Sequence, residues 1–181
     1  MYHSHFSEVS QMGRGLYGPI IVLAPGERFD PETDRVLFFG TAGTNENVVF
    51  GPFTPFVLNG KTQPADMAMK VGTTYRFRLF NLAGDAPLMV SMNDGEKPIQ
   101  WRAVAKDGFA LPSVQATMRP AVLVFDPGEI YDFEVTPATA GELNLKFGPP
   151  PFPPPPPPPP GTPPLPFAPP PPTITVPIHV R

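Results

Sequence analysis

The chain of 181 residues contains no cysteine and only three histidines, His3, His5 and His179. The absence of cysteine excludes disulfides, thiolate nucleophiles and every metal site that needs a thiolate ligand. It does not identify a cellular compartment, because a secreted domain can also lack cysteine. The histidines are therefore the first side chains to consider as metal ligands.

Charge and long apolar runs are also scarce, which excludes further classes of protein. Charged residues make up 16% of the chain and the formal net charge is −3. No basic patch is visible, so nucleic acid is not an expected partner. No apolar run approaches the roughly 20 residues that a membrane span needs. No Gly-x-Ser-x-Gly elbow occurs, and residues 40–44 lack the lysine and following helix of a phosphate loop.

Proline, in contrast, is abundant and concentrated in one tract. Of the 31 prolines, 18 lie among the 24 residues from Pro149 to Pro172. Such a run must be polyproline II or disordered, and at ~3.1 Å per residue it could extend on the order of 70 Å. We interpret residues 149–172 as a long protruding loop. A partner with an aromatic-lined groove is the kind that would bind it.

The rest of the chain has the pattern of short strands separated by turns, with no convincing helix. Tyr75, Phe77 and Leu79 alternate with polar residues, a period of two that is typical of half-buried strands. Asn59-Gly60 and Asp126-Pro127-Gly128 are turn signals. The expected strands cover 20–23, 36–39, 56–58, 67–71, 75–79, 88–92, 100–106, 121–126, 130–136, 142–147 and 173–180.

This spacing predicts an all-β fold, a Greek-key β-sandwich from about Asp34 to Arg181 with a long proline-rich loop. Seven side chains are expected to face its core, namely Tyr75, Phe77, Leu79, Val122, Val124, Phe133 and Val135. The methionines are expected to pack in cores rather than to bind copper. Arg76 and Arg78 are expected on a solvated or interdomain face, and His179 is expected to be structural.

His3-Ser4-His5 is the most informative motif. Residues i and i+2 of an extended strand point to the same face, roughly 6.5–7 Å apart along the chain. Two imidazoles placed in this way can each hold one ion of a close metal pair, while Ser4 points away. Taken alone, a His-x-His pair occurs more often by chance than as a site.

The residues around this pair resemble a family segment. Met1 to Phe6, Gln11-Met12 and Gly15 to Val22 are similar to the second His-x-His motif of the multicopper oxidases, the superfamily of laccases and bilirubin oxidases. Further segments resemble the second, cupredoxin-like domain of that family, namely residues 56–60, 72–81, 106–108, 127–132 and 176–181. The resemblance covers nearly the whole chain except the proline tract.

The resemblance implies that His3 and His5 are type 3 copper ligands of a trinuclear cluster, one to each copper of the pair. The complete family member oxidises a reducing substrate, here unknown, and reduces dioxygen to water. The first His-x-His motif, the later His-rich motif and the His-Cys-His motif of the family are absent from this chain. The missing cupredoxin domains are therefore the expected partners, no catalytic site is complete in this chain, and Met1 is expected to correspond to an internal residue of the parent.

The implied organisation has three parts. Residues 1–24 are the end of a first cupredoxin domain, 25–34 a linker, and 35–181 the second domain with its insertion at 149–172. The first 24 residues cannot bury a core alone, so they complete a missing domain or dock against the one present. Two alternatives stay open, a non-catalytic structural or docking module and an interaction protein that uses the proline tract. A periplasmic or secreted location rests on the resemblance only.

Overall fold

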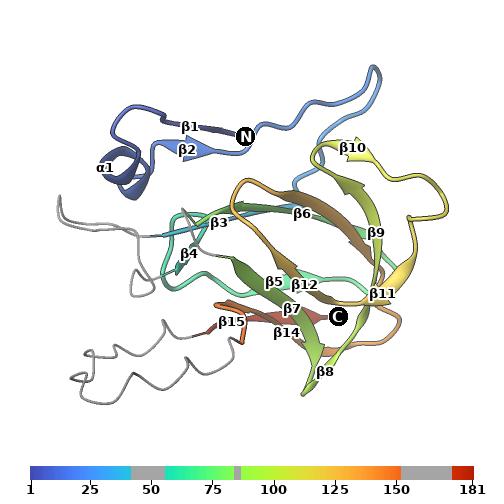
Figure 1. The fold of residues 1–181 in the computed structure, drawn as a ribbon. Helices are drawn as coiled ribbons and strands as arrows, with labels where there is room; N and C mark the ends of the chain where they lie inside the picture. Colours follow the sequence, from blue (N-terminus) through green and yellow to red (C-terminus); the bar gives the residue numbers. More distant parts are fainter. Residues whose placement is uncertain (42–55, 84–86, 152–172) are drawn as a thin grey trace, which may run out of the picture.

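The computed structural model describes residues 1–41, 56–83, 87–151 and 173–181. In this part of the chain almost all regular structure is β-strand, arranged as two large facing sheets with a smaller N-terminal unit above them (Figure 1). The N-terminal unit consists of β1 (Tyr2–His3), α1 (Glu8–Gly13) and β2 (Tyr17–Gly18). β1 and β2 form a two-stranded antiparallel sheet whose strands pair with no strand of the other two sheets in the described residues.

The larger sheet has seven strands in the described residues. Its order is β10-β9-β13-β6-β3-β4, with β11 also paired to β9. The parallel pairing of β3 with β6 requires a crossover connection between the layers, whereas β6, β13 and β9 pair antiparallel. The strands are β3 (Asp34–Thr41), β4 (Phe56–Leu58), β6 (Tyr75–Leu82), β9 (Gln100–Lys106), β10 (Phe109–Ala110), β11 (Met118–Pro120) and β13 (Ile130–Val135).

Within the described ranges, the second sheet has six strands in the order β12-β7-β14-β15-β5, with β8 also paired to β7. The C-terminal strand β15 lies between β14 and β5, and its pairing with β5 is parallel. The strands are β5 (Met67–Met69), β7 (Leu88–Asp94), β8 (Lys97–Pro98), β12 (Val122–Phe125), β14 (Gly141–Gly148) and β15 (Ile174–Val180).

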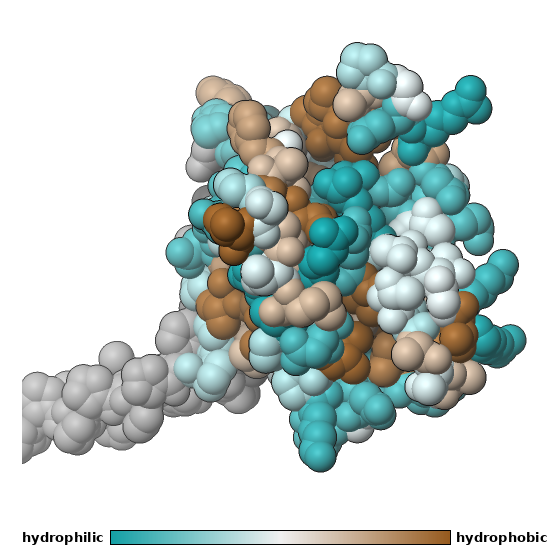
Figure 2. Space-filling view, turned by 90° about the vertical axis from the view of Figure 1, so that its right-hand side faces the viewer, coloured by the Kyte–Doolittle hydropathy of each residue, from teal (hydrophilic) through white to brown (hydrophobic). Residues whose placement is uncertain are grey.

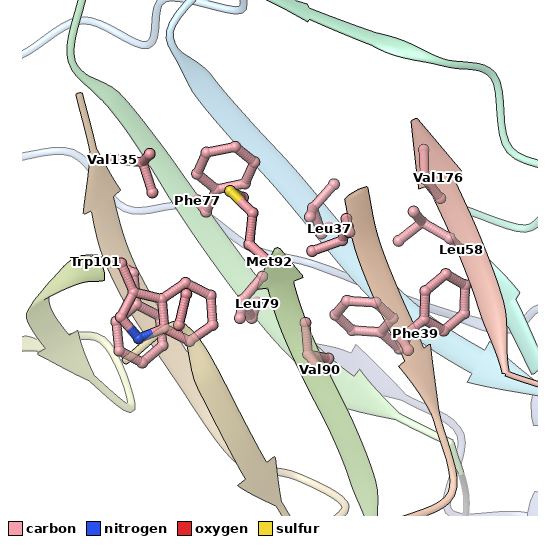
Figure 3. Packing of buried hydrophobic residues seen from close by; sticks show 14 of the residues in the cluster. Leu37, Phe39, Leu58, Phe77, Leu79, Val90, Met92, Trp101, Val135 and Val176 are labelled. Carbon is pink, nitrogen blue, oxygen red and sulfur yellow. The ribbon is translucent and has the colours of Figure 1, made fainter. Parts of the chain in front are cut away.

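The core lies between the two large sheets and is rich in aromatic rings (Figure 3). The Trp101 indole stacks on the Phe133 ring with centroids 4.0 Å apart, and both side chains are fully buried. Phe39 contacts Phe147 across the sandwich, with ring centroids 5.1 Å apart. Offset and edge contacts of this kind add about 0.5–1.5 kcal/mol per pair beyond the area that they bury.

The predicted β-sandwich is confirmed, and most predicted strands lie within one or two residues of the observed ones. The alternation of β6 correctly places Tyr75, Phe77 and Leu79 in the core, and Phe133 and Val135 are buried as well. Val122 and Val124 are wrong: they are 42% and 53% exposed. Every residue of β12 is apolar, so period two could not decide which face is buried. Leu123 and Phe125 face the core instead.

Two further sequence predictions fail in the N-terminal unit. Residues 20–23 are not a strand, although all four side chains are apolar and three are β-branched, because they have no neighbouring strand to pair with in the described structure. The pattern also gave no helix, whereas α1 forms over six residues. A helix of this length is marginal by itself and depends on tertiary contacts.

The turn predictions agree better. Asn59 and Gly60 have φ values of 50° and 77°, the conformation that a two-residue Asn-Gly turn requires. The predicted proline-rich loop lies mostly outside the described residues. Its two ends are visible, however: Gly148 and Thr173 are in contact where the paired strands β14 and β15 meet.

Candidate metal site

The N-terminal unit is attached to the outer face of the seven-stranded sheet. Met12 of α1 and Tyr17 of β2 are buried there against Phe80 and Leu82 of β6. Along β6, odd-numbered side chains enter the sandwich core, so Phe80 and Leu82 point to the opposite face. In the described residues the N-terminal unit therefore packs against the outer face of the sandwich.

Gly40 of β3 provides the closest approach in this interface. A Cβ atom at position 40 would lie only 2.7 Å from Cζ of Tyr17, so no side chain fits beneath the tyrosine ring. Burial raises the pKa of the Tyr17 phenol above its ordinary value. Tyr17 therefore packs directly against the β3 backbone at Gly40 and holds the N-terminal unit against the sheet.

His3 and His5 project from this docked unit. His3 ends β1, and His5 follows in a bend two residues later. Their ring centroids are 4.4 Å apart with an interplanar angle of 40°, so both imidazoles lie on one side of the chain. His5 is exposed and His3 is half-buried. Nδ1 of His3 is 3.1 Å from the Ser4 carbonyl oxygen, which leaves Nε2 as the nitrogen that can ligate.

Ser4 lies between the two histidines, and two of its hydrogen bonds connect it to helix α1 and to the residue that precedes β2. Its amide donates to the Leu16 carbonyl oxygen at 3.3 Å, and its hydroxyl donates to Oε1 of Gln11 on α1. Leu16 in turn donates its amide to the Gln11 carbonyl oxygen at 2.9 Å. In the sequence, only the family resemblance draws attention to Gln11, and Ser4 is expected to point away from the imidazoles. Their contact depends on α1, which the pattern did not predict.

The donor atoms of His3 and His5 suit copper only in part. Neutral imidazole suits copper, and two imidazoles on one side of the chain fit as a pair of ligands. In the described residues, however, no group of three or more His, Cys, Asp or Glu side chains could hold a metal ion. The pair therefore fits copper as part of a larger ligand set and not as a complete site.

The third histidine belongs to a different place in the fold. Nδ1 of His179 is 2.7 Å from a Glu142 carboxylate oxygen, and Nε2 is 3.1 Å from Asp66. The hydrogen bonds to Asp66 and then to Glu142 raise the pKa of the His179 imidazole. Both ring nitrogens are engaged, so His179 ties β14 and β15 to the segment before β5.

The two arginines of β6 are engaged as well. Arg78 binds Asp34 at 2.6 Å and Asp132 at 3.0 Å, and Arg76 binds Asp132 at 2.7 Å. The Asp132 and Arg78 side chains are only 9% and 13% exposed. These ion pairs argue against an anion site, because both arginines are already paired with carboxylates on the outer face of the sheet.

The side of the molecule where β9 to β11 lie carries a pocket that is lined by Ile99, Gln100 and Met118, among other residues. In Figure 2, which looks at that side, hydrophobic residues form several separate patches among hydrophilic ones. In the part of the chain that the structure describes, no helix is long and apolar enough to cross a bilayer.

The solved structures to which the chain is similar are multicopper oxidases, the family that its N-terminal segment resembles. No protein-family model and no curated protein matches the chain. Its fold is similar to a blue copper oxidase from Nitrosomonas europaea, with TM-score 0.64 and 18% identity over 96% of this chain and 52% of that one. The multicopper oxidase Fet3p gives TM-score 0.61 and 16% identity over 81% and 28% of the two chains. A multicopper oxidase from Pseudomonas thermotolerans gives 0.57 and 26% over 79% and 36%.

These similarities identify the class of fold as a cupredoxin-like sandwich. More particularly, the chain is multicopper oxidase-like, as the His-Ser-His segment and its flanking residues indicated. It spans 28% of the length of Fet3p and 52% of the length of the Nitrosomonas enzyme.

Proposed function

We propose that this chain supplies two type 3 copper ligands, His3 and His5, and the middle β-sandwich of a multicopper oxidase. The complete assembly would couple oxidation of a reducing substrate to reduction of dioxygen to water. Residues 1–24 would belong to a first cupredoxin domain, 25–34 to a linker, and 35–181 to the second domain.

One observation carries this proposal: the two imidazoles lie together on one side of a segment that is docked on a multicopper oxidase-like sandwich. The docking matters because a pair of ligands contributes to a cluster only if its position relative to the other domains is fixed. Met12 and Tyr17 provide that fixed position through buried contacts with β6 and β3.

When bound, copper would supply the electron-transfer and dioxygen chemistry. The chain's own contribution is to hold two neutral imidazoles in place. It has no cysteine, so a type 1 blue-copper site cannot form from its residues. Other cupredoxin domains must provide the remaining ligands, and the chain by itself is expected to be inactive.

The adjacent genomic sequence is the first test. An upstream His-x-His motif and a downstream His-Cys-His motif would allow the joined protein to be expressed and loaded with copper. Replacing His3 and His5 by alanine in that protein should remove the type 3 copper signal and most oxygen consumption, while the blue type 1 colour remains.

His179→Gln is the matched control, because it removes the other imidazole of the chain at a place away from the pair. It should leave both the type 3 signal and the oxygen consumption unchanged. Full oxygen reduction by the His3→Ala/His5→Ala protein would refute the assignment, however well the flanking residues match.

A non-catalytic docking module remains the alternative. The adjacent genomic sequence distinguishes the two, because such a module would have no oxidase motifs beside it. The comparisons with solved structures do not favour it. A periplasmic or secreted location is part of the proposal and is supported only by the resemblance to the family.

A further inference from the structure

We infer that Gln11 and Ser4 are positioning residues that set the orientation of the His3–His5 pair. The inference rests on the proposed function, since it concerns how the candidate copper ligands are held. Neither side chain would touch the metal. Ser4 would act on His3 through its carbonyl oxygen, and Gln11 would act through Ser4.

The geometry gives a continuous path from the sandwich to the imidazoles. Phe80 and Leu82 hold Met12 of α1, and the next residue toward the N-terminus in the same short helix is Gln11. Its side-chain oxygen accepts the hydrogen bond from the Ser4 hydroxyl. Helix α1 therefore links Ser4, the residue between the two ligands, to the outer face of the sheet.

Competition for the Ser4 hydroxyl shows why Gln11 matters. The hydroxyl has one hydrogen and two acceptors within reach, Oε1 of Gln11 and the Phe6 carbonyl oxygen at 2.8 Å. With Gln11 present, the hydroxyl bridges the His segment to α1. Without it, the only acceptor left of the two is Phe6 in the same loop, and the side-chain tie to α1 is lost.

The orientation of His3 is the property that this tie should control. The Nδ1 hydrogen bond to the Ser4 carbonyl oxygen selects one neutral tautomer, with the Nε2 lone pair available to a metal. That bond requires the Ser4 peptide to keep its direction, which its amide and its hydroxyl both restrain. Outer partners of metal-binding histidines commonly act in this way.

The test uses the full 181-residue chain, labelled with ¹⁵N, at about pH 8.5, where an ordinary imidazole is neutral. Imidazole ¹⁵N spectra without copper should show His3 mainly as the Nδ1–H tautomer. Gln11→Ala should shift His3 toward a mixture of tautomers. Gln11→Glu keeps an oxygen acceptor for Ser4 and should preserve the wild-type spectrum, while thermal unfolding of the sandwich stays the same in all three proteins.

Titration with Cu(II) alone gives the second measurement. Loss of an outer partner typically weakens metal affinity by about 10–100-fold, so Gln11→Ala should bind Cu(II) more weakly by that factor and Gln11→Glu should not. If Gln11→Ala keeps both the tautomer and the affinity of the wild type, the inference is overturned and the proposed function stands. If the tautomer depends on Gln11 but replacing His3 and His5 by alanine leaves Cu(II) binding unchanged, the positioning role stands and the copper assignment fails.

Discussion

Replacing Gly40 by alanine should release the N-terminal unit from the sandwich while leaving the sandwich folded. The new methyl group would lie 2.7 Å from Cζ of Tyr17, well inside van der Waals contact. Gly40 lies within strand β3, so its backbone cannot yield easily, and the adjustment falls on the phenol end of Tyr17. The ring, and the unit that carries it, must move away from the sheet.

The expected size of the effect follows from the contacts. Burial of Met12 and Tyr17, which are 9% and 8% exposed, contributes at most about 1.5–3 kcal/mol for each side chain. Overpacking by one methyl group typically costs about 1–3 kcal/mol. Since 1.4 kcal/mol corresponds to a tenfold change in an equilibrium, the undocked population should rise by about 5-fold to 150-fold.

Limited trypsin digestion measures this population. Cleavage after Arg14, which follows α1, should accelerate by that factor if opening is fast relative to cleavage. Cleavage after the exposed Arg28 serves as the internal reference. Gly141→Ala is the matched control, because a Cβ at that position meets no atom within 4 Å. Unchanged cleavage after Arg14 in Gly40→Ala would refute the docking argument.

Three further predictions concern the rest of the chain. Replacing residues 149–172 by a short turn should spare the fold and raise stability by about 2 kcal/mol through the smaller loop-closure entropy, measured by urea unfolding; failure to fold would show that the tract belongs to the core. The raised pKa of His179 stabilises the fold fully below the unfolded value of about 6.5, and this contribution is lost as pH rises through the folded value. The Tm of the wild type should therefore fall over that pH range, and His179→Gln should remove this part of the pH dependence. If the two proteins have the same dependence of Tm on pH, the hydrogen bonds of His179 with Asp66 and Glu142 do not stabilise the fold. The purified chain loaded with copper should show no intense blue absorption and no oxygen consumption with a phenolic donor, and turnover by the chain alone would contradict the proposal of an incomplete site.

The strands were predictable where one face is apolar and the other polar. In β6 the arginines between Tyr75, Phe77 and Leu79 mark the face outside the sandwich, so the register follows from the sequence. In β12 no polar residue marks that face, and the prediction chose Val122 and Val124 wrongly. Hydrophobicity identifies a strand, but its orientation is decided by the strand with which it pairs.

The candidate site was predictable only in part. The spacing of His3 and His5 places two imidazoles on one side, which depends on local backbone geometry alone. The support beneath them depends on long-range contacts, such as that between Tyr17 and Gly40. A glycine inside a strand can indicate the close approach of another segment, but the sequence does not say which segment approaches.

The position of β15 has a consequence for the order of folding. The last strand lies inside the six-stranded sheet, and β5 pairs with it through Met67 and Ile178, which are far apart in the sequence. During synthesis β5 therefore has no strand partner among the described residues until residues 174–180 have left the ribosome, and one edge of β14 stays unpaired for as long. Contacts of such high sequence separation slow folding. The six-stranded sheet can therefore be completed only after residues 174–180 have been made.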